Sequence, residues 1–150
     1  MRFSIEDAVT VPSITLVYRP TDHSFDVEPK PLGGGASLLV NDLQLELDED
    51  GRVLYAWGLC PQTSWTEEAG EPPRARRAVL VAQLPADFSP GMSMRLSTHP
   101  WPVVVDRRSG WVRVGMSRES DDAVEFAPGM VATFLDGQLV GVWLRPRELP

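Results

Sequence analysis

The sequence contains few of the residues on which metal sites and nucleophilic catalysis usually depend. Its 150 residues include one cysteine, Cys60, and two histidines, His23 and His99. A single cysteine cannot form an internal disulfide, which is typical of proteins from the reducing cytoplasm. Metal sites usually combine several Cys or His ligands at short spacing, and the chain has no CxxC motif and no histidine pair at helical spacing. We therefore expect a cytoplasmic protein without a metal or another cofactor.

Long apolar runs and helical segments are also scarce. No apolar run approaches the roughly 18 to 20 residues that cross a bilayer, and residues 1–13 lack the apolar stretch of a secretory signal. The 14 prolines and 12 glycines interrupt most windows of helical length. We therefore expect no membrane partner and little helix.

Positive charge is scarce in the first half of the chain. The net charge is −7, and residues 1–75 hold five basic and thirteen acidic side chains. Such a surface repels phosphate backbones, so we expect no nucleic-acid partner. A basic protein partner fits this charge better, and the simpler alternative is that the charge only keeps the protein soluble.

Short runs rich in β-branched and aromatic residues are frequent. Leu43, Leu45 and Leu47 alternate with polar residues, as in a strand buried on one face. The predicted strands are residues 14–18, 43–47, 52–57, 78–84, 101–105, 111–116, 130–135 and 138–144. Between them, "LGGGASL" (32–38) has no Lys-Ser/Thr after its glycines, so we interpret it as a flexible loop and not as a phosphate-binding loop. The sequence therefore predicts a mainly β fold.

Two stretches of the chain spell the same hairpin. Asp50-Gly51 and Asp136-Gly137 each lie between apolar runs, with Trp57 and Trp143 seven residues beyond the aspartate. Apolar positions match at an offset of 87 before the turn and 86 after it, because "DEDG" (48–51) has one extra residue. We interpret this as an internal repeat over about 14–59 and 101–145, joined by an insert at about 60–100 within one compact domain. The predicted architecture is a duplicated antiparallel hairpin unit that forms a sandwich or a partly open barrel.

The second copy resembles the YuzE-like family of small uncharacterised bacterial proteins. The match is best over residues 104–144, where "AVEFAPGMVATFLDGQLVGVWL" follows "VVVDRRSGWVRVG", and it is looser over 14–59. Two positions depart from the pattern: Trp143 stands where the family commonly has an acid, and Tyr55 of the first copy matches Gly141 of the second. The resemblance implies a small cytoplasmic protein with an antitoxin-like role in a gene pair.

No catalytic residue can be assigned from the sequence. Cys60 and His99 are the only conceivable nucleophile–base pair, and we interpret Cys60 as a buried structural residue. "DEDG" (48–51) resembles a fragment of a calcium loop but lacks the later ligands, which favours a hairpin turn. Trp57, Trp111 and Trp143 are expected in the core or at an interface between the two copies. Trp65 and Trp101 lie in proline-containing loops, so each is either packed back on the core or offered to a partner.

Two function classes remain, and the first is favoured. It is a non-enzymatic protein-interaction module, of the antitoxin or immunity type, that binds a basic partner through an acidic hairpin. The predicted partner-binding residues are Asp42, Glu46, Asp48, Glu49, Asp50, Trp65 and Trp101. The alternative is a small-ligand-binding or enzymatic β-domain with a pocket between the two halves, lined by His99, Cys60 and Arg113. A homo-oligomer is compatible with either class, and a purely structural oligomerising domain is a third hypothesis.

Overall fold

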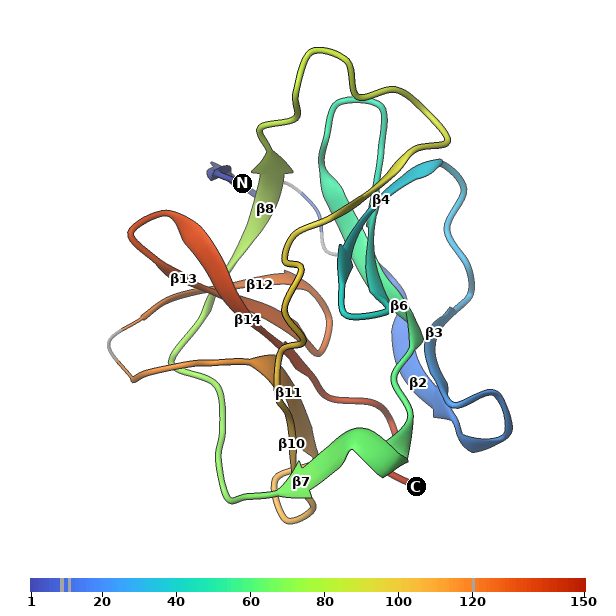
Figure 1. Ribbon diagram of the computed structural model, residues 1–150, viewed down its shortest axis with the longest axis vertical. Coiled ribbons are helices and arrows are strands. Elements are labelled where there is room, and N and C mark those ends of the chain that lie inside the picture. The colour runs from blue at the N-terminus through green and yellow to red at the C-terminus, as the bar shows by residue number, and fades with distance from the viewer. Residues whose placement is uncertain (9, 11, 120) are drawn as a thin grey trace.

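The computed structural model describes residues 1–8, 10, 12–119 and 121–150, and these residues form two β-sheets (Figure 1). The only helical turns in this part of the chain are η1 (Pro20–Asp22) and η2 (Gln62–Ser64). No described helix has the length and apolar character needed to span a membrane. The prediction of a mainly β fold with little helix is confirmed, and the two sheets have free edges, as in a sandwich or an open barrel.

The smaller sheet has six strands and contains the first copy of the hairpin unit. In spatial order its strands are β2 (Thr15–Arg19), β3 (Ser24–Glu28), β6 (Val53–Leu59), β5 (Leu43–Leu47), β4 (Ala36–Val40) and β9 (Ser93–Arg95). All neighbours are antiparallel except β4 and β9, which run parallel. The labelled strands β2, β3, β4 and β6 lie on the right of Figure 1.

The larger sheet has eight strands and contains the second copy. In spatial order its strands are β1 (Phe3–Asp7), β8 (Arg76–Ala82), β12 (Asp122–Ala127), β13 (Met130–Leu135), β14 (Gln138–Leu144), β11 (Trp111–Gly115), β10 (Val103–Asp106) and β7 (Trp65–Glu67). The insert expected at about 60–100 therefore supplies β7, β8 and β9, and these strands extend both sheets.

Five strands of each sheet pair in the same order, and the register is shared except between β12 and β13, where an irregularity after Glu125 shifts the pairing relative to that of β4 and β5. The order β2-β3-β6-β5-β4 corresponds to β10-β11-β14-β13-β12. Leu45 faces Ala56 in the first sheet, and Ala132 faces Val142 in the second. These pairs are related by the offsets of 87 and 86 read from the sequence. An irregularity lies at the same place in both hairpins, after Glu46 in one and after Thr133 in the other.

The core lies between the two sheets. One apolar cluster includes buried side chains from both, and the largest fully buried ones include Phe25, Leu45 and Met130. Met130 of β13 reaches the middle of the opposite sheet, where its sulfur lies 3.2 Å from the amide nitrogen of Ala56. Burial of each such side chain stabilises the fold by about 1.5–3 kcal/mol.

One expectation about local structure is wrong, and several short strands were not predicted. The flexible loop expected at 32–38 ends earlier, because Ala36, Ser37 and Leu38 form the first residues of β4 and pair with β5. That part of the prediction is wrong, because residues 36–38 belong to a strand and Leu38 is fully buried. The three glycines before the strand gave this segment the sequence pattern of a loop. Short strands such as β7 and β9 were also not predicted, because three residues are too few to show a period.

Trp57, Trp111 and Trp143, which were expected in the core or between the copies, lie on outer faces of the sheets, and of these three only Trp143 is buried. Trp143 is buried, but it forms a second small cluster with Val131 and Ala123, against which Trp111 packs. Trp57 is half-buried, and its ring lies under the Lys30 ammonium at 4.9 Å. Successive side chains of a strand point to opposite faces of the sheet. Because Ala56 and Val142 point to the inner face, the next residues, Trp57 and Trp143, must point outward.

Candidate functional site

Two of the five predicted acidic residues are engaged in holding the hairpin together. Glu46 accepts hydrogen bonds from the Trp57 indole nitrogen at 3.0 Å and from the Gly35 amide at 2.9 Å. Asp48 accepts from the amides of Asp50 and Arg52, both at 2.9 Å, which fixes the β5–β6 turn. These two carboxylates therefore have structural partners.

The other three carboxylates are exposed but do not form one patch. Asp42 lies in the β4–β5 turn, whereas Glu49 and Asp50 lie in the β5–β6 turn, at the opposite end of β5. Asp42 forms an ion pair with Arg95 at 3.5 Å, and Asp50 forms one with Arg52 at 2.9 Å. Asp42 is therefore separated from Glu49 and Asp50 by the length of β5, although all three are close in the sequence.

An apolar groove lies beside the β5–β6 turn. We call residues 48–50 the acidic turn and the hollow of about 240 Å³ next to it the apolar groove. Leu47, Leu84 and Phe88 line the groove, and Asp48 and Glu49 stand at its border. Leu84 and Phe88 are half-buried against the core. Negative charge and apolar surface therefore meet at one place on the protein.

Trp65 and Trp101, which the sequence placed in loops, both pack back on the protein, and Trp65 is the first residue of β7 and not part of a loop. The Trp65 ring lies 5.0 Å from Tyr18 and 6.3 Å from Phe25, where β7 meets the first sheet. Trp101 is held by Asn41, whose side chain accepts from the Trp101 amide at 2.8 Å and donates to its carbonyl at 2.9 Å. Trp101 therefore lies beside the turn that carries Asp42, whereas Trp65 lies against Tyr18 and Phe25.

The residues of the alternative pocket, His99, Cys60 and Arg113, occupy three different surroundings. Cys60 is 5% exposed, and burial raises the pKa of its thiol to about 11, although the nearby Trp65 indole lowers it. An un-ionised thiol is a poor nucleophile. His99 is exposed in a loop, where its amide donates to the Ser97 hydroxyl at 3.1 Å. Arg113 lies on the outer face of the larger sheet, so these three side chains do not build one site.

A small hollow does exist where the two sheets approach each other. It has a volume of about 170 Å³ and lies between β6, β8 and β12, lined by apolar residues such as Val53, Ala78 and Phe126. The three predicted pocket residues are not among its lining. Within the described residues, no three His, Cys, Asp or Glu side chains are grouped in a way that could hold a metal ion.

A larger cleft lies on the outer face of the eight-stranded sheet. Its volume is about 910 Å³, and the connection after β7, the β10–β11 turn and the connection after β11 border it. We call it the arginine cleft after the four arginines that line it: Arg74, Arg108, Arg113 and Arg118. Of these, the sequence analysis singled out only Arg113, because the others are scattered along the chain with no spacing that marks a shared surface.

The walls of the arginine cleft are held by specific contacts. Asp106 accepts hydrogen bonds from the Gly70 amide at 3.0 Å and the Arg108 amide at 2.9 Å, and these bonds lower the pKa of its carboxyl. Ser109 donates to the Gly70 carbonyl at 3.0 Å. The connection after β7 is therefore fastened to the β10–β11 turn, and the cleft has a defined wall.

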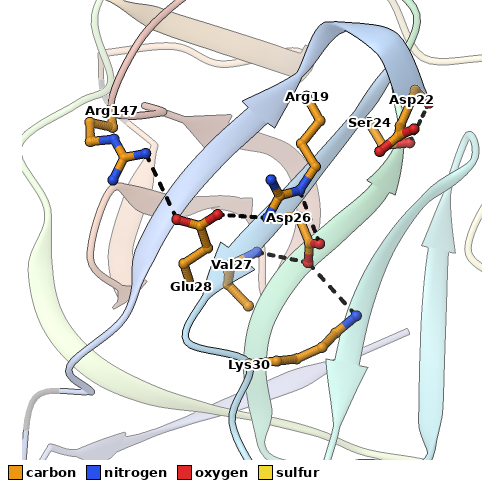
Figure 2. A network of polar contacts seen from close by, with 8 residues as sticks. All are labelled: Arg19, Asp22, Ser24, Asp26, Val27, Glu28, Lys30 and Arg147. Carbon is orange, nitrogen blue, oxygen red and sulfur yellow. Dashed lines mark hydrogen bonds and ion pairs between the residues drawn. The ribbon is translucent and has the colours of Figure 1, made fainter.

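A network of ion pairs covers the outer face of β2 and β3 (Figure 2). Arg19 binds Glu28 at 2.7 Å and Asp26 at 3.5 Å, and Lys30 lies 3.7 Å from Asp26. Arg147 approaches Glu28 at 3.8 Å, which links the C-terminal segment to β3. The three basic and two acidic side chains of this network pair with one another, so we assign it to the fold and not to a charged ligand.

Comparison with models of known protein families gives no match, and comparison with curated proteins gives no significant match. The YuzE-like resemblance stays a prediction from the residues that carry it. Function must therefore be argued from the surfaces described above.

Proposed function

We propose that the protein is a non-enzymatic interaction module that binds a basic protein partner at the acidic turn and the apolar groove. The supporting observation is that the half-buried Asp48 and the exposed Glu49 border a hollow lined by Leu84 and Phe88. Charge steers association, while burial of an apolar side chain supplies affinity. A basic toxin is the partner that an antitoxin or immunity protein would require.

Not all five predicted acidic residues are available to bind a basic partner. Glu46 and Asp48 hold the hairpin, so their substitution would alter the structure as well as the charge. Asp42 lies at the far end of β5. Two carboxylates remain as the proposed contacts of a partner: Glu49, at the border of the groove, and Asp50, which lies next to it in the turn and pairs with Arg52.

The experiment is affinity capture with the tagged protein from a lysate of its own organism, followed by association kinetics with the captured partner. The variant Glu49→Gln/Asp50→Asn should associate about 3- to 10-fold more slowly at low salt, with a smaller difference at high salt. Phe88→Ala should mainly accelerate dissociation, because it removes apolar contact and no charge.

A matched control removes two negative charges elsewhere. Asp22→Asn/Glu148→Gln changes exposed residues away from the groove, and we expect association within about twofold of the original rate. Asp42→Asn should behave like this control. Equal slowing in all three charge variants would show that only net charge matters, and the proposed site would then be wrong.

A further inference from the structure

The four arginines of the arginine cleft lack acidic partners. In the described part of the chain, Arg74, Arg108, Arg113 and Arg118 form no ion pair, whereas seven other basic residues do. Arg113 is positioned by the protein itself, since its Nε donates to the Gly115 carbonyl at 2.9 Å and its guanidinium lies 5.7 Å from the centre of the Trp143 ring. Positive charge is thus gathered in one cleft of a protein whose net charge is −7.

The carboxylates of the cleft do not neutralise this charge. Asp106 is occupied by backbone amides, as described above. Glu71 and Glu119 also line the cleft, without ion pairs to its arginines. Four guanidinium groups therefore face the three carboxylates of Asp106, Glu71 and Glu119, which leaves the lining of the cleft with a net charge of +1.

Two buried hydrogen-bond donors point to the same conclusion. Trp143 and Ser117 both line the cleft. The Trp143 side chain is only 4% exposed, and neither its Nε1 nor the Ser117 hydroxyl oxygen has a hydrogen-bond partner among the described residues. Buried donors normally have an acceptor. Both atoms have almost no exposed surface, so the wall of the cleft must shift slightly before a ligand oxygen could complete them.

We propose that the arginine cleft binds a small polyanion, a molecule with two or more phosphate or carboxylate groups. Guanidinium groups bind both anions through paired, charge-assisted hydrogen bonds. The volume of about 910 Å³ is that of a small-molecule site. A nucleic acid is disfavoured, because a long polyanion would meet the repulsion of the whole acidic surface, whereas a small ligand meets mainly the local field.

The test is calorimetric titration of the full chain at low ionic strength with pyrophosphate, citrate and a single-stranded oligonucleotide. We expect pyrophosphate or citrate to bind with a dissociation constant below about 1 mM. The probe that binds more tightly distinguishes phosphate from carboxylate ligands. The variant Arg108→Gln/Arg118→Gln should weaken binding at least about tenfold. Arg108 and Arg118 donate to Asp106 and Asp121 through their backbone amides, which the substitutions keep.

The control Arg19→Gln/Arg95→Gln removes two positive charges on the other sheet and should change affinity by less than about twofold. In nitrogen–proton correlation spectra, the indole signal of Trp143 should shift with ligand while that of Trp57 does not. Failure of both small probes to bind, equal weakening in both variants, or binding of the oligonucleotide alone would each overturn the proposal. The acidic turn takes no part in this test, so its outcome is independent of the proposed function.

Discussion

At the scale of single residues, the acidic side chains of the first half have unequal roles. Glu46 and Glu49 are equivalent in the sequence, where both belong to one acidic run. In the structure Glu46 joins β5 to Trp57 of β6 and to the glycine loop before β4, whereas Glu49 lies in the turn. The sequence could not separate them, because these partners are 11 residues away.

Substitution of Glu46 should therefore lower stability where substitution of Glu49 does not. Glu46→Ala removes a half-buried acceptor of two hydrogen bonds, and we expect the free energy of unfolding to fall by about 1–3 kcal/mol. Glu49→Ala should change it by less than about 0.5 kcal/mol. Urea unfolding monitored by far-UV circular dichroism measures both, and equal effects would contradict the assigned roles.

The buried thiol and phenol predict how stability depends on pH. Burial raises the pKa of Cys60 from 9.0 to about 11 and that of Tyr18 from 10.0 to about 12. Both groups are neutral below these values, so their contribution to stability is complete below about pH 9. This contribution to stability is lost as the pH rises from about 9 to about 12, because the thiol and the phenol lose their protons at a lower pH in the unfolded chain than in the folded protein.

Unfolding experiments at pH 8, 9 and 10 should therefore show a decreasing free energy of unfolding. The Cys60 contribution approaches about 1.4 kcal/mol per pH unit between the two thiol pKa values. Cys60→Ala should make the decrease less steep above pH 9. A variant with the same slope as the original protein would show that the thiol does not titrate differently on folding.

At the scale of strands, the sequence predicted the longer apolar runs and missed shorter or more polar strands, including β3, although its Phe25 and Val27 alternate with polar residues. The predicted bounds 43–47, 130–135 and 138–144 coincide with β5, β13 and β14. These strands are lined by regularly spaced apolar residues and end in Asp-Gly turns or Pro-Gly steps. β4 follows three glycines, and β12 is interrupted by an irregularity after Glu125, so their periodicity was obscured.

The first copy has Tyr55 at the position where the second copy has Gly141, and this difference has a structural reason. After β11, the Met116 amide donates to the Val140 carbonyl at 2.9 Å, which draws the chain across Gly141. The position that matches Met116 in the first copy is Pro29, which has no amide hydrogen and cannot make this bond. The chain therefore does not follow the same course there, and the first copy can hold Tyr55.

A methyl group at Gly141 should consequently be costly. It would clash with the Met116 carbonyl oxygen and lie 2.8 Å from the Thr133 hydroxyl oxygen. We expect Gly141→Ala to lower the free energy of unfolding by about 2–4 kcal/mol. Gly70→Ala is the matched control, since its methyl group would lie at an ordinary 3.4 Å from Trp143. A change below about 1 kcal/mol in both variants would contradict the close approach.

At the scale of the whole molecule, the proposed binding surfaces depend on how the sheets are assembled. The apolar groove combines the β5–β6 turn with residues near Leu84, and the arginine cleft combines segments from Gly70 to Trp143. No local pattern joins residues so far apart in the sequence. The sequence could therefore predict a β fold and the bounds of several strands, but not which charged side chains meet.

The same assembly predicts that both sheets unfold together. Met130 of the larger sheet is fully buried against Ala56 of the smaller one, at the centre of a core shared by both. Met130→Ala should therefore lower the free energy of unfolding by about 2–5 kcal/mol and leave a single transition, whether tryptophan fluorescence or circular dichroism is followed. Two separate transitions would instead mean that the halves are stable units, each with a core of its own, and that contacts such as Met130–Ala56 contribute little to the fold.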